Sequence, residues 1–456
     1  MTTAKGSFYT TLVSGVLATF GALGCADAAS NMQPNTGSVT QAETPGCAAL
    51  TLPSQNSAAV FELGQHIEAG QELEVCALQQ VGPEDIWLNS TDMMLSKGSH
   101  HGLLWLTDYD ELPELDRSGD PIEIGKVVRC ESAAFGRFSV IRPLAGSQGT
   151  GNITAPGVLP PDVAERIPAN AYVVTNLHML NSMDRAIDAC MKVAVNAIPE
   201  HRVAQEAGVL FFYNPFIALA GHSTGQARMA CAVTADIHLR TAVSHMHARG
   251  VGYRASWLDA SPFADGTHTL QTLYETTEWD SPADKVWPEP LPLRAGNFID
   301  YTCDYENAEA RDVAQGFATS DEMCMFSGAY WPYEPSLTFC GTNTQGYTIG
   351  SGDHDGSTFM NCMLTNLQQP GATEACGSDG CTDYAARVAF QSCFRDACPA
   401  VGEYASGYLN CVKQNAGDCR SRCGGGTASD TGCLLNCLNH EKCPDVSASL
   451  AATQCH

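Results

Sequence analysis

The sequence predicts a mainly β protein with two tandem antiparallel β-sandwich (jelly-roll-like) domains and a small, disulfide-linked α-helical module at the C-terminal end. From about residue 47, short apolar runs alternate with Gly, Pro, Asp and Asn, as is typical of short strands joined by turns. The same alternation of short apolar runs and turn residues begins again at about residue 201. The last part differs, because cysteines become dense and several stretches have the pattern of amphipathic helices.

The first sandwich is expected over residues 47–200 and the second over residues 201–369. Gly102–Thr107 is representative of the strands of the first domain, and Arg240–His247 of those of the second. Gly146–Pro161 is rich in Gly, Pro and Thr and is expected to be a long surface loop. A chain of 456 residues is long enough for each domain to have its own core.

The C-terminal module, residues 370–456, holds eleven of the 21 cysteines. Cys419 and Cys423, like Cys433 and Cys437, are four residues apart and therefore share a helical face. This spacing predicts a helical hairpin that turns at the glycines 424–426 and is closed by nested bridges Cys419–Cys437 and Cys423–Cys433. A zinc site is the alternative, but an oxidising compartment favours disulfides.

The N-terminal residues 1–24 have the features of an export signal, with Lys5 followed by the apolar run Phe8–Leu23. Residues 25–46 lack hydrophobic periodicity and are expected to be a disordered tether. The sequence allows two alternatives for the end of the signal. One is a lipoprotein-type box in which Cys25 carries a lipid, and the other is ordinary cleavage at residues 26–28. The protein is expected to be exported, either as a cell-envelope lipoprotein or in secreted form.

The formal charge of -26, from 24 Lys+Arg against 50 Asp+Glu, argues against nucleic-acid binding. Contact with a membrane is expected only through a lipid on Cys25. Once Cys25 is set aside, 20 cysteines remain, and an even number in an exported chain predicts disulfides rather than reactive thiols.

Five histidines and one methionine stand in short motifs that suit metal binding. They are His100, His101, His178, His245, His247 and Met323. His245 and His247 are two apart in a predicted strand and project from the same face. His100 and His101 are adjacent, so both can reach one metal only at a β-bulge or a strand end. Imidazoles combined with a thioether suit copper that cycles between Cu(I) and Cu(II).

These motifs together resemble those of the copper type II, ascorbate-dependent monooxygenases, the family of dopamine β-monooxygenase and peptidylglycine hydroxylating monooxygenase. The resemblance rests on the His100-His101 pair, the segment 178–181 (HMLN), the His245-x-His247-x-x-Gly motif, and the segment 321–324 (DEMC) with Tyr-Trp-Pro at 330–332. Three positions depart from the family pattern, with Gly102, Met179 and Trp331 in place of Met, Tyr and Tyr. The resemblance spans roughly residues 47–366, with all six ligand positions in order.

The resemblance implies two copper ions. His245, His247 and Met323 would hold the copper that binds and activates O2. The copper that stores and passes the second electron would be held by His100, His101 and His178. The resemblance also implies four disulfides, Cys47–Cys190, Cys76–Cys130, Cys231–Cys340 and Cys303–Cys324, and leaves Cys362 to pair with the tail.

The implied activity is hydroxylation of a substrate C–H bond with O2 and ascorbate or another one-electron reductant. The partner is a small-molecule or peptide substrate. Val243 and Met325 stand where peptide-amidating members have Arg and Asn, so an apolar or aromatic substrate is expected. One alternative is an exported protein that binds or sequesters copper without turnover, and another is an extracellular binding module. Removing the tail after about Gln369 is expected to leave copper binding intact.

Overall fold

The computed structural model describes residues 46–53, 57–130, 133–148, 151–154, 159–264, 269–340, 346–367, 384–423, 433 and 436–455. The expected signal peptide (1–24), Cys25, residues 26–45 of the expected tether and the glycines 424–426 lie outside this part. Lipid attachment at Cys25 therefore stays a prediction. Within the described ranges, no helix combines the length and the apolar character needed to cross a membrane.

The chain divides into two compact units built mainly from antiparallel sheets. The first comprises the described part of Met1–Val158 together with Arg166–His201. The second comprises Leu159–Glu165 together with the described part of Arg202–His456. Strand β8 (Val163–Ile167) and the 3-10 helix η1 (Glu200–Arg202) lie where the chain passes from one unit to the other. The predicted mainly β class with a disulfide-rich helical C-terminal region is confirmed.

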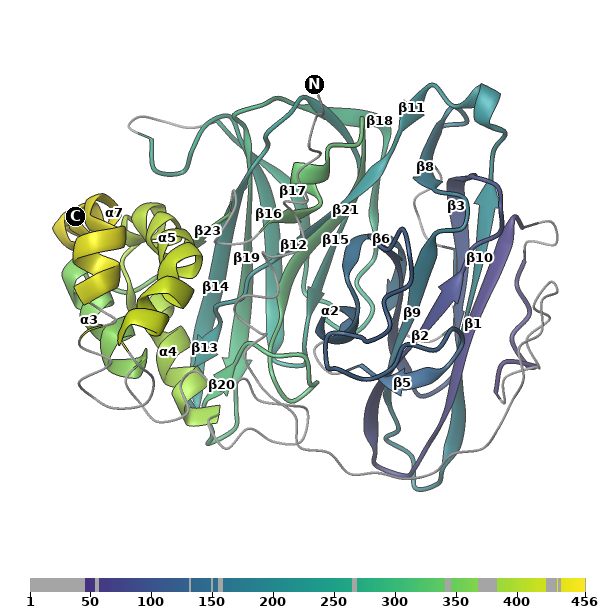
Figure 1. Ribbon diagram of the computed structural model, residues 1–456, viewed down its shortest axis with the longest axis horizontal. Helices are drawn as coiled ribbons and strands as arrows, with labels where there is room; N and C mark the ends of the chain where they lie inside the picture. The colour runs from purple at the N-terminus through teal and green to yellow at the C-terminus, as the bar shows by residue number, and fades with distance from the viewer. Residues whose placement is uncertain are drawn as a thin grey trace. The chain divides into compact units, whose positions relative to one another are not determined.

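Two sheets enclose the core of the first unit (Figure 1). Its elements are β1 (Ala59–Ile67), β2 (Glu72–Gln80), β3 (Ile86–Leu95), β4 (Ser99–Thr107), β5 (Val127–Arg129), α2 (Ala133–Arg137), β6 (Val140–Gln148), β7 (Gly151–Thr154), β9 (Tyr172–Leu180) and β10 (Ile187–Ala197). One sheet has the order β5-β2-β9-β4-β6, and the other contains β1-β10-β3 with β7 beside β3. Alternate side chains from both sheets, among them Leu63, Met93 and Leu177, are fully or almost fully buried between them.

The expectation of a loop over Gly146–Pro161 is wrong in part. Strand β6 extends to Gln148, and Gly151–Thr154 pairs with β3 as strand β7. The ladder between β7 and β3 uses backbone N–H and C=O groups, so residues with weak strand propensity can still join a sheet whose partner strand is already in place.

The second unit has a β-sandwich of its own. Its strands are β11 (Gln205–Glu206), β12 (Gly208–Tyr213), β13 (Ala218–Leu219), β14 (Ser223–Ala232), β15 (Ile237–Met246), β16 (Gly250–Leu258), β17 (Leu270–Thr276), β18 (Lys285–Leu293), β19 (Phe298–Asn307), β20 (Val313–Ala314), β21 (Cys324–Trp331), β22 (Phe339–Cys340) and β23 (Gly346–Ile349), with a 3-10 helix η2 (Pro335–Leu337). The sheet orders are β18-β15-β21-β12-β22 and β17-β16-β19-β14-β23, and β13 pairs separately with β20. Disulfides Cys231–Cys340 and Cys303–Cys324 each join one large sheet to the other.

A helical region follows the second sandwich and packs against it (Figure 1). It consists of α3 (Gly356–Leu367), α4 (Tyr384–Asp396), α5 (Val401–Cys423), the π-helix η3 (Cys437–Lys442) and α7 (Pro444–Ala452). Helix α4 contacts β13 and β20, and α5 contacts β23. The shared core includes Phe216 from the sandwich and Phe359, Phe394 and Leu450 from the helices. The helices begin at Gly356, ahead of the expected boundary at residue 370.

Nine disulfides join cysteines within the described part of the chain. Four are the pairs that the family resemblance implies, and Cys419–Cys437 and Cys423–Cys433 are the nested pairs that the tail spacing predicts. Cys362 pairs with Cys393, which confirms the expectation that it bonds to the tail. The sequence did not predict Cys398–Cys455 and Cys411–Cys443. Disulfides at this density indicate an oxidising, extracellular location.

Asp284 makes the second sandwich sensitive to pH. It follows Ala283, whose carbonyl oxygen accepts a hydrogen bond of 2.7 Å from the Tyr274 hydroxyl. Burial raises the pKa of the Asp284 carboxyl from its ordinary value of 3.8 to about 6. Because this pKa is higher in the folded state, the stabilising contribution of the protonated carboxyl is complete below about pH 4 and is lost as the pH rises through 6.

We therefore predict that Asp284→Asn is more stable than the wild type at about pH 8. The expected difference in unfolding free energy is about 1–2 kcal/mol, allowing for solvent screening of a partly exposed group. The difference should vanish near pH 4, where both side chains are neutral. Urea unfolding at the two pH values measures it, and a difference independent of pH would contradict the argument.

Candidate metal centres

Three imidazoles meet on neighbouring strands of the first unit. His100 and His101 belong to β4 and His178 to β9, and one ligand atom from each lies within 4.8 Å of the others. The ring centroids are 4.9–5.4 Å apart. The sequence therefore predicted a set of residues that the fold brings together, and this set could hold a metal ion.

A β-bulge explains how two adjacent histidines reach one point. Ser99 pairs with Met179 and His101 pairs with His178, so His100 is an extra residue on β4 without a counterpart on β9. In a regular strand, neighbouring side chains point to opposite faces. The bulge removes this alternation locally and allows both imidazoles to join His178.

Glu72 orients the third imidazole of this cluster. His178 is 2% exposed, and its Nε2–H donates a 2.8 Å hydrogen bond to Glu72 Oε1. This bond places the proton on Nε2 and leaves a lone pair on Nδ1, which is buried and has no hydrogen-bond partner within the described ranges. A carboxylate behind a ligand imidazole is the usual support of a metal-binding histidine. Glu72 is not among the residues predicted from the sequence, because the register of β2 against β9 is not visible in a sequence motif.

A second cluster forms at one end of β15 and β21. His245 pairs with Met325 and Met246 pairs with Cys324, so one further step along this register brings His247 level with Met323. Met246 and Cys324 point into the core. His245, His247, Met323 and Met325 consequently share the opposite face of the sheet. The two imidazole centroids are 5.3 Å apart at an angle of 88°.

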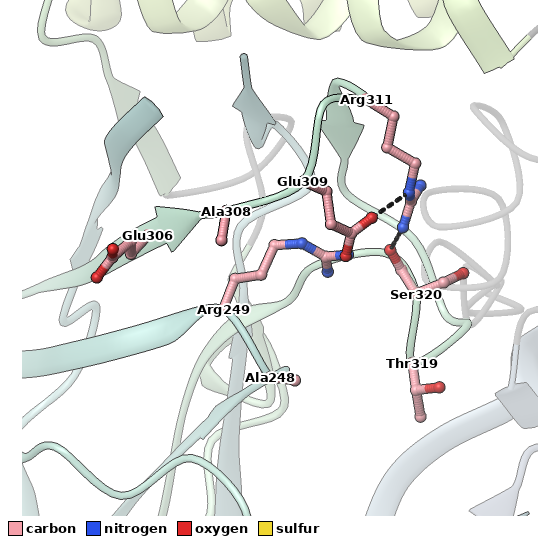
Figure 2. Close-up of a pocket in the computed structure, with 8 residues that line it drawn as sticks. All are labelled: Ala248, Arg249, Glu306, Ala308, Glu309, Arg311, Thr319 and Ser320. Atoms are coloured by element: carbon pink, nitrogen blue, oxygen red, sulfur yellow. Dashed lines mark hydrogen bonds and ion pairs between the residues drawn. The ribbon is translucent and has the colours of Figure 1, made fainter. Parts of the chain in front are cut away.

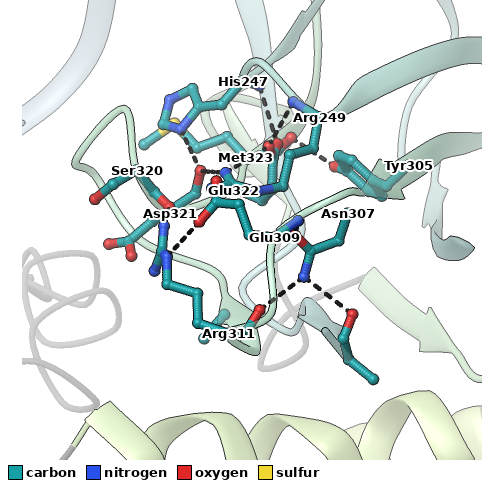
Figure 3. Close-up of polar contacts among 12 residues, drawn as sticks. His247, Arg249, Tyr305, Asn307, Glu309, Arg311, Ser320, Asp321, Glu322 and Met323 are labelled. Atoms are coloured by element: carbon teal, nitrogen blue, oxygen red, sulfur yellow. Dashed lines mark hydrogen bonds and ion pairs between the residues drawn. The ribbon is translucent and has the colours of Figure 1, made fainter. Parts of the chain in front are cut away.

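The loop before Met323 holds His247 by two hydrogen bonds and Arg249 by a third (Figure 3). His247 Nδ1–H donates to the Asp321 carbonyl oxygen at 3.0 Å, which places the lone pair of the neutral ring on Nε2. Glu322 accepts the backbone N–H of His247 at 3.1 Å and that of Arg249 at 3.0 Å. Burial raises the pKa of Glu322 to about 7, while the two backbone donors and Arg249 oppose this shift.

Two contacts fix the backbone at Met323. The Tyr305 hydroxyl donates a 2.7 Å hydrogen bond to the Met323 carbonyl oxygen (Figure 3). The next residue, Cys324, is joined to Cys303 on β19. Met323 itself is 6% exposed. The thioether is thus carried by a restrained backbone at the start of a strand, in the position expected of a preorganised ligand.

An open pocket of about 450 Å³ adjoins this loop (Figure 2). It is lined by Ala248, Arg249, Glu306, Ala308, Glu309, Arg311, Thr319 and Ser320. Both guanidinium groups converge on Glu309, with Arg311 Nε 2.6 Å from Oε2 and Arg249 Nη2 in contact with Oε1. Arg249 Nη1 also lies 3.4 Å from Glu322 Oε1, so the two cations are paired with two carboxylates at this pocket.

The fold and the two clusters define a β-sandwich protein with candidate transition-metal centres. Residues 210–351 match the family model of the copper type II ascorbate-dependent monooxygenase, C-terminal domain. The matched segment includes His245, His247 and Met323, and the family resemblance drawn from the motifs is confirmed over these residues. The assignment of individual ligands stays a prediction.

No sequence of a curated protein matches this chain. Among solved structures, a mutant VP2 protein of infectious bursal disease virus is 9% identical with a TM-score of 0.16, and the alignment covers 65% of this chain and 74% of that one. The N-terminal CBM22-1-CBM22-2 tandem domain from Paenibacillus barcinonensis Xyn10C is 9% identical with a TM-score of 0.11, covering 64% and 88%. Scores this low carry no argument about the fold or function of this protein.

The hydrogen bond from His178 to Glu72 predicts a measurable effect on copper affinity. We expect Glu72→Ala to weaken copper binding at the histidine cluster by about 10–100-fold, because the imidazole loses the partner that sets its tautomer and orientation. Glu72→Gln keeps an acceptor oxygen and should lose less. Competition titration with a copper chelator measures both variants.

The matched control is Glu68→Ala, which removes a highly exposed carboxylate from the same region. It should leave copper affinity unchanged. Equal losses in Glu72→Ala and Glu68→Ala would point to net charge, and not orientation, as the cause.

Proposed function

We propose that this protein is a copper-dependent monooxygenase that hydroxylates a substrate C–H bond with O2 and electrons from ascorbate or another one-electron reductant. One observation carries the proposal: His100, His101 and His178 lie together, and the segment that matches the family's C-terminal domain contains His245, His247 and Met323 on one sheet face. One oxygen atom enters the C–H bond and the other leaves as water, so each turnover needs two electrons and two protons.

The donor sets fit copper. The first cluster offers three imidazoles, including the buried Nδ1 of His178. The second offers two imidazoles and the thioether of Met323, a soft ligand that favours Cu(I) and is a poor ligand for Mg²⁺ or Ca²⁺. We propose that His100, His101 and His178 hold one copper and that His245, His247 and Met323 hold the other.

Bound copper would supply the one-electron chemistry and O2 activation that amino-acid side chains cannot provide. The protein's own contribution is geometric. Glu72 orients His178, the Asp321 carbonyl orients His247, and Tyr305 restrains the backbone of Met323. Each of these contacts restrains a residue that would bind the metal. This restraint lowers the conformational entropy lost when the site forms.

An uncharged sheet face beside His245 supports an apolar or aromatic substrate. The register places Met325 beside His245 and Tyr213 beside Met325. The Tyr213 ring stacks on Phe317 with centroids 6.2 Å apart and an angle of 16°. Val243, two residues before His245, adds another apolar group on this face. No cation among these side chains would bind a substrate carboxylate, so we propose that recognition depends on apolar and aromatic contact.

The experiment that tests this function is O2 consumption by the copper-loaded protein with ascorbate and a panel of apolar and aromatic substrates. We expect substrate-dependent O2 uptake and one ¹⁸O atom in the product when ¹⁸O2 is supplied. His178→Ala and His245→Ala should each abolish coupled turnover, whereas the exposed His201→Ala should not. Two bound coppers without substrate-dependent O2 uptake would support an exported copper-binding protein instead.

Met323 and Met325 provide a sharper comparison, because both lie on the ligand face. Met323→His keeps three donors but replaces the soft ligand, so copper should still bind while Cu(I) is destabilised and hydroxylation collapses. Met325→Leu should retain both coppers and alter substrate KM more than copper affinity. Metal analysis and initial rates measure the two variants. Near-normal hydroxylation by Met323→His, or loss of copper from Met325→Leu, would show that the wrong methionine is assigned.

A further inference from the structure

Helix α4 of the C-terminal region packs directly behind the loop that leads to Met323. Its Phe394 ring stacks on Phe216 with centroids 3.7 Å apart and an angle of 10°. Phe216 lies just before β13, and β13 pairs with β20 through Ala218 and Ala314. The helix therefore rests on the two-stranded sheet from which the loop 315–322 starts.

Two polar side chains of α4 bind the backbone at the start of this loop. The Tyr384 hydroxyl accepts the N–H of Ala314 at 3.0 Å, and Gln391 Oε1 accepts the N–H of Gln315 at 2.7 Å. Gln391 is 5% exposed, so its amide is held in place by packing. Tyr384 also contacts Arg311, whose Nη1 lies 3.3 Å from the hydroxyl oxygen.

The same residues connect to the end of the loop. The carbonyl oxygen of Ala314 accepts the N–H of Glu322 at 3.1 Å, and Glu322 directly precedes Met323. The N–H of Gly316 donates to the Glu322 carbonyl oxygen at 3.1 Å. From the Tyr384 hydroxyl to the residue before the thioether ligand there are consequently only two hydrogen bonds, joined through one residue, Ala314.

A second connection reaches His247 through charged side chains (Figure 3). Arg311 lies 2.6 Å from Glu309 and also donates to the carbonyl oxygen of Ser320. Glu309 contacts Arg249, which follows His247 by two residues and lies 3.4 Å from Glu322. Tyr384 therefore contacts an ion-pair network that ends at both segments bearing the ligands.

We infer that helix α4 is a positioning element for the Met323 side of the metal centre, with Tyr384 and Gln391 as its positioning residues. The inference rests on the proposed function, because it takes Met323 and His247 as copper ligands. It gives the disulfide-linked helical region a role in the site. It also reverses the expectation from sequence that this region could be removed without loss of copper binding.

The test uses the full-length protein loaded with Cu(I). Tyr384→Phe removes one hydroxyl, Gln391→Met removes the amide at similar volume, and the double variant removes both. Tyr404→Phe in α5 is the matched control, since it makes the same chemical change at an exposed site of the helical region. The readouts are the copper–sulfur contribution to X-ray absorption, Cu(I) affinity by chelator competition, and thermal stability.

We expect the double variant to lose the copper–sulfur signal and about tenfold in Cu(I) affinity at this centre, with smaller losses in each single variant. Affinity at the His100, His101 and His178 cluster should stay unchanged and serves as the internal reference. Lower thermal stability with an intact copper–sulfur signal would overturn the inference while leaving the proposed function in place. A wild-type protein without any copper–sulfur signal would overturn the ligand assignment and the inference together.

Discussion

The antiparallel register of β15 against β21 is the constraint on which the candidate site depends. Side chains alternate across a sheet, so pairing His245 with Met325 sends Met246 and Cys324 into the core and the ligand candidates to the other face. A slip of one residue would bury an imidazole and expose the core. The Cys303–Cys324 disulfide joins β21 to the facing sheet and makes such a slip costly, so the cross-link and the core together determine the geometry of the site.

The cluster in the first unit has a different constraint, because two of its three imidazoles are adjacent in sequence. Regular pairing cannot direct both His100 and His101 to one point, and the bulge at His100 provides the extra residue that allows it. Glu72 on β2 then sets the proton position on His178 from the strand on the other side of β9. Three neighbouring strands thus contribute to one cluster, which places it on a more rigid support than a loop could offer.

The sequence was sufficient for the mainly β class and for the resemblance to the family matched over residues 210–351, because both depend on local patterns: short apolar runs between turns, His-x-His spacing and short motifs around His178 and Met323. It could not show what depends on register or on long-range packing. The hydrogen bond between Glu72 and His178 and the strand at Gly151–Thr154 are of this kind. The place of each methionine beside the histidines is another. Met323 and Met325 share one sheet face, and only the pairing of β21 with β15 shows that Met325 lies beside His245 and Met323 level with His247.

The two clusters also differ in how their candidate ligands are supported. The imidazoles of the first unit lie on paired strands, whose hydrogen-bond ladder continues on both sides. Met323 follows a loop, and a ligand at the end of a loop is only as well placed as the loop itself. Here the loop is closed on itself by Ala314 and Glu322 and is held from behind by α4. A small helical layer has too little core to be rigid without cross-links, and the Cys362–Cys393 bridge joins α4 to α3. The Cys362–Cys393 bridge therefore supports the helix on which, by our inference, the Met323 side of the candidate centre depends.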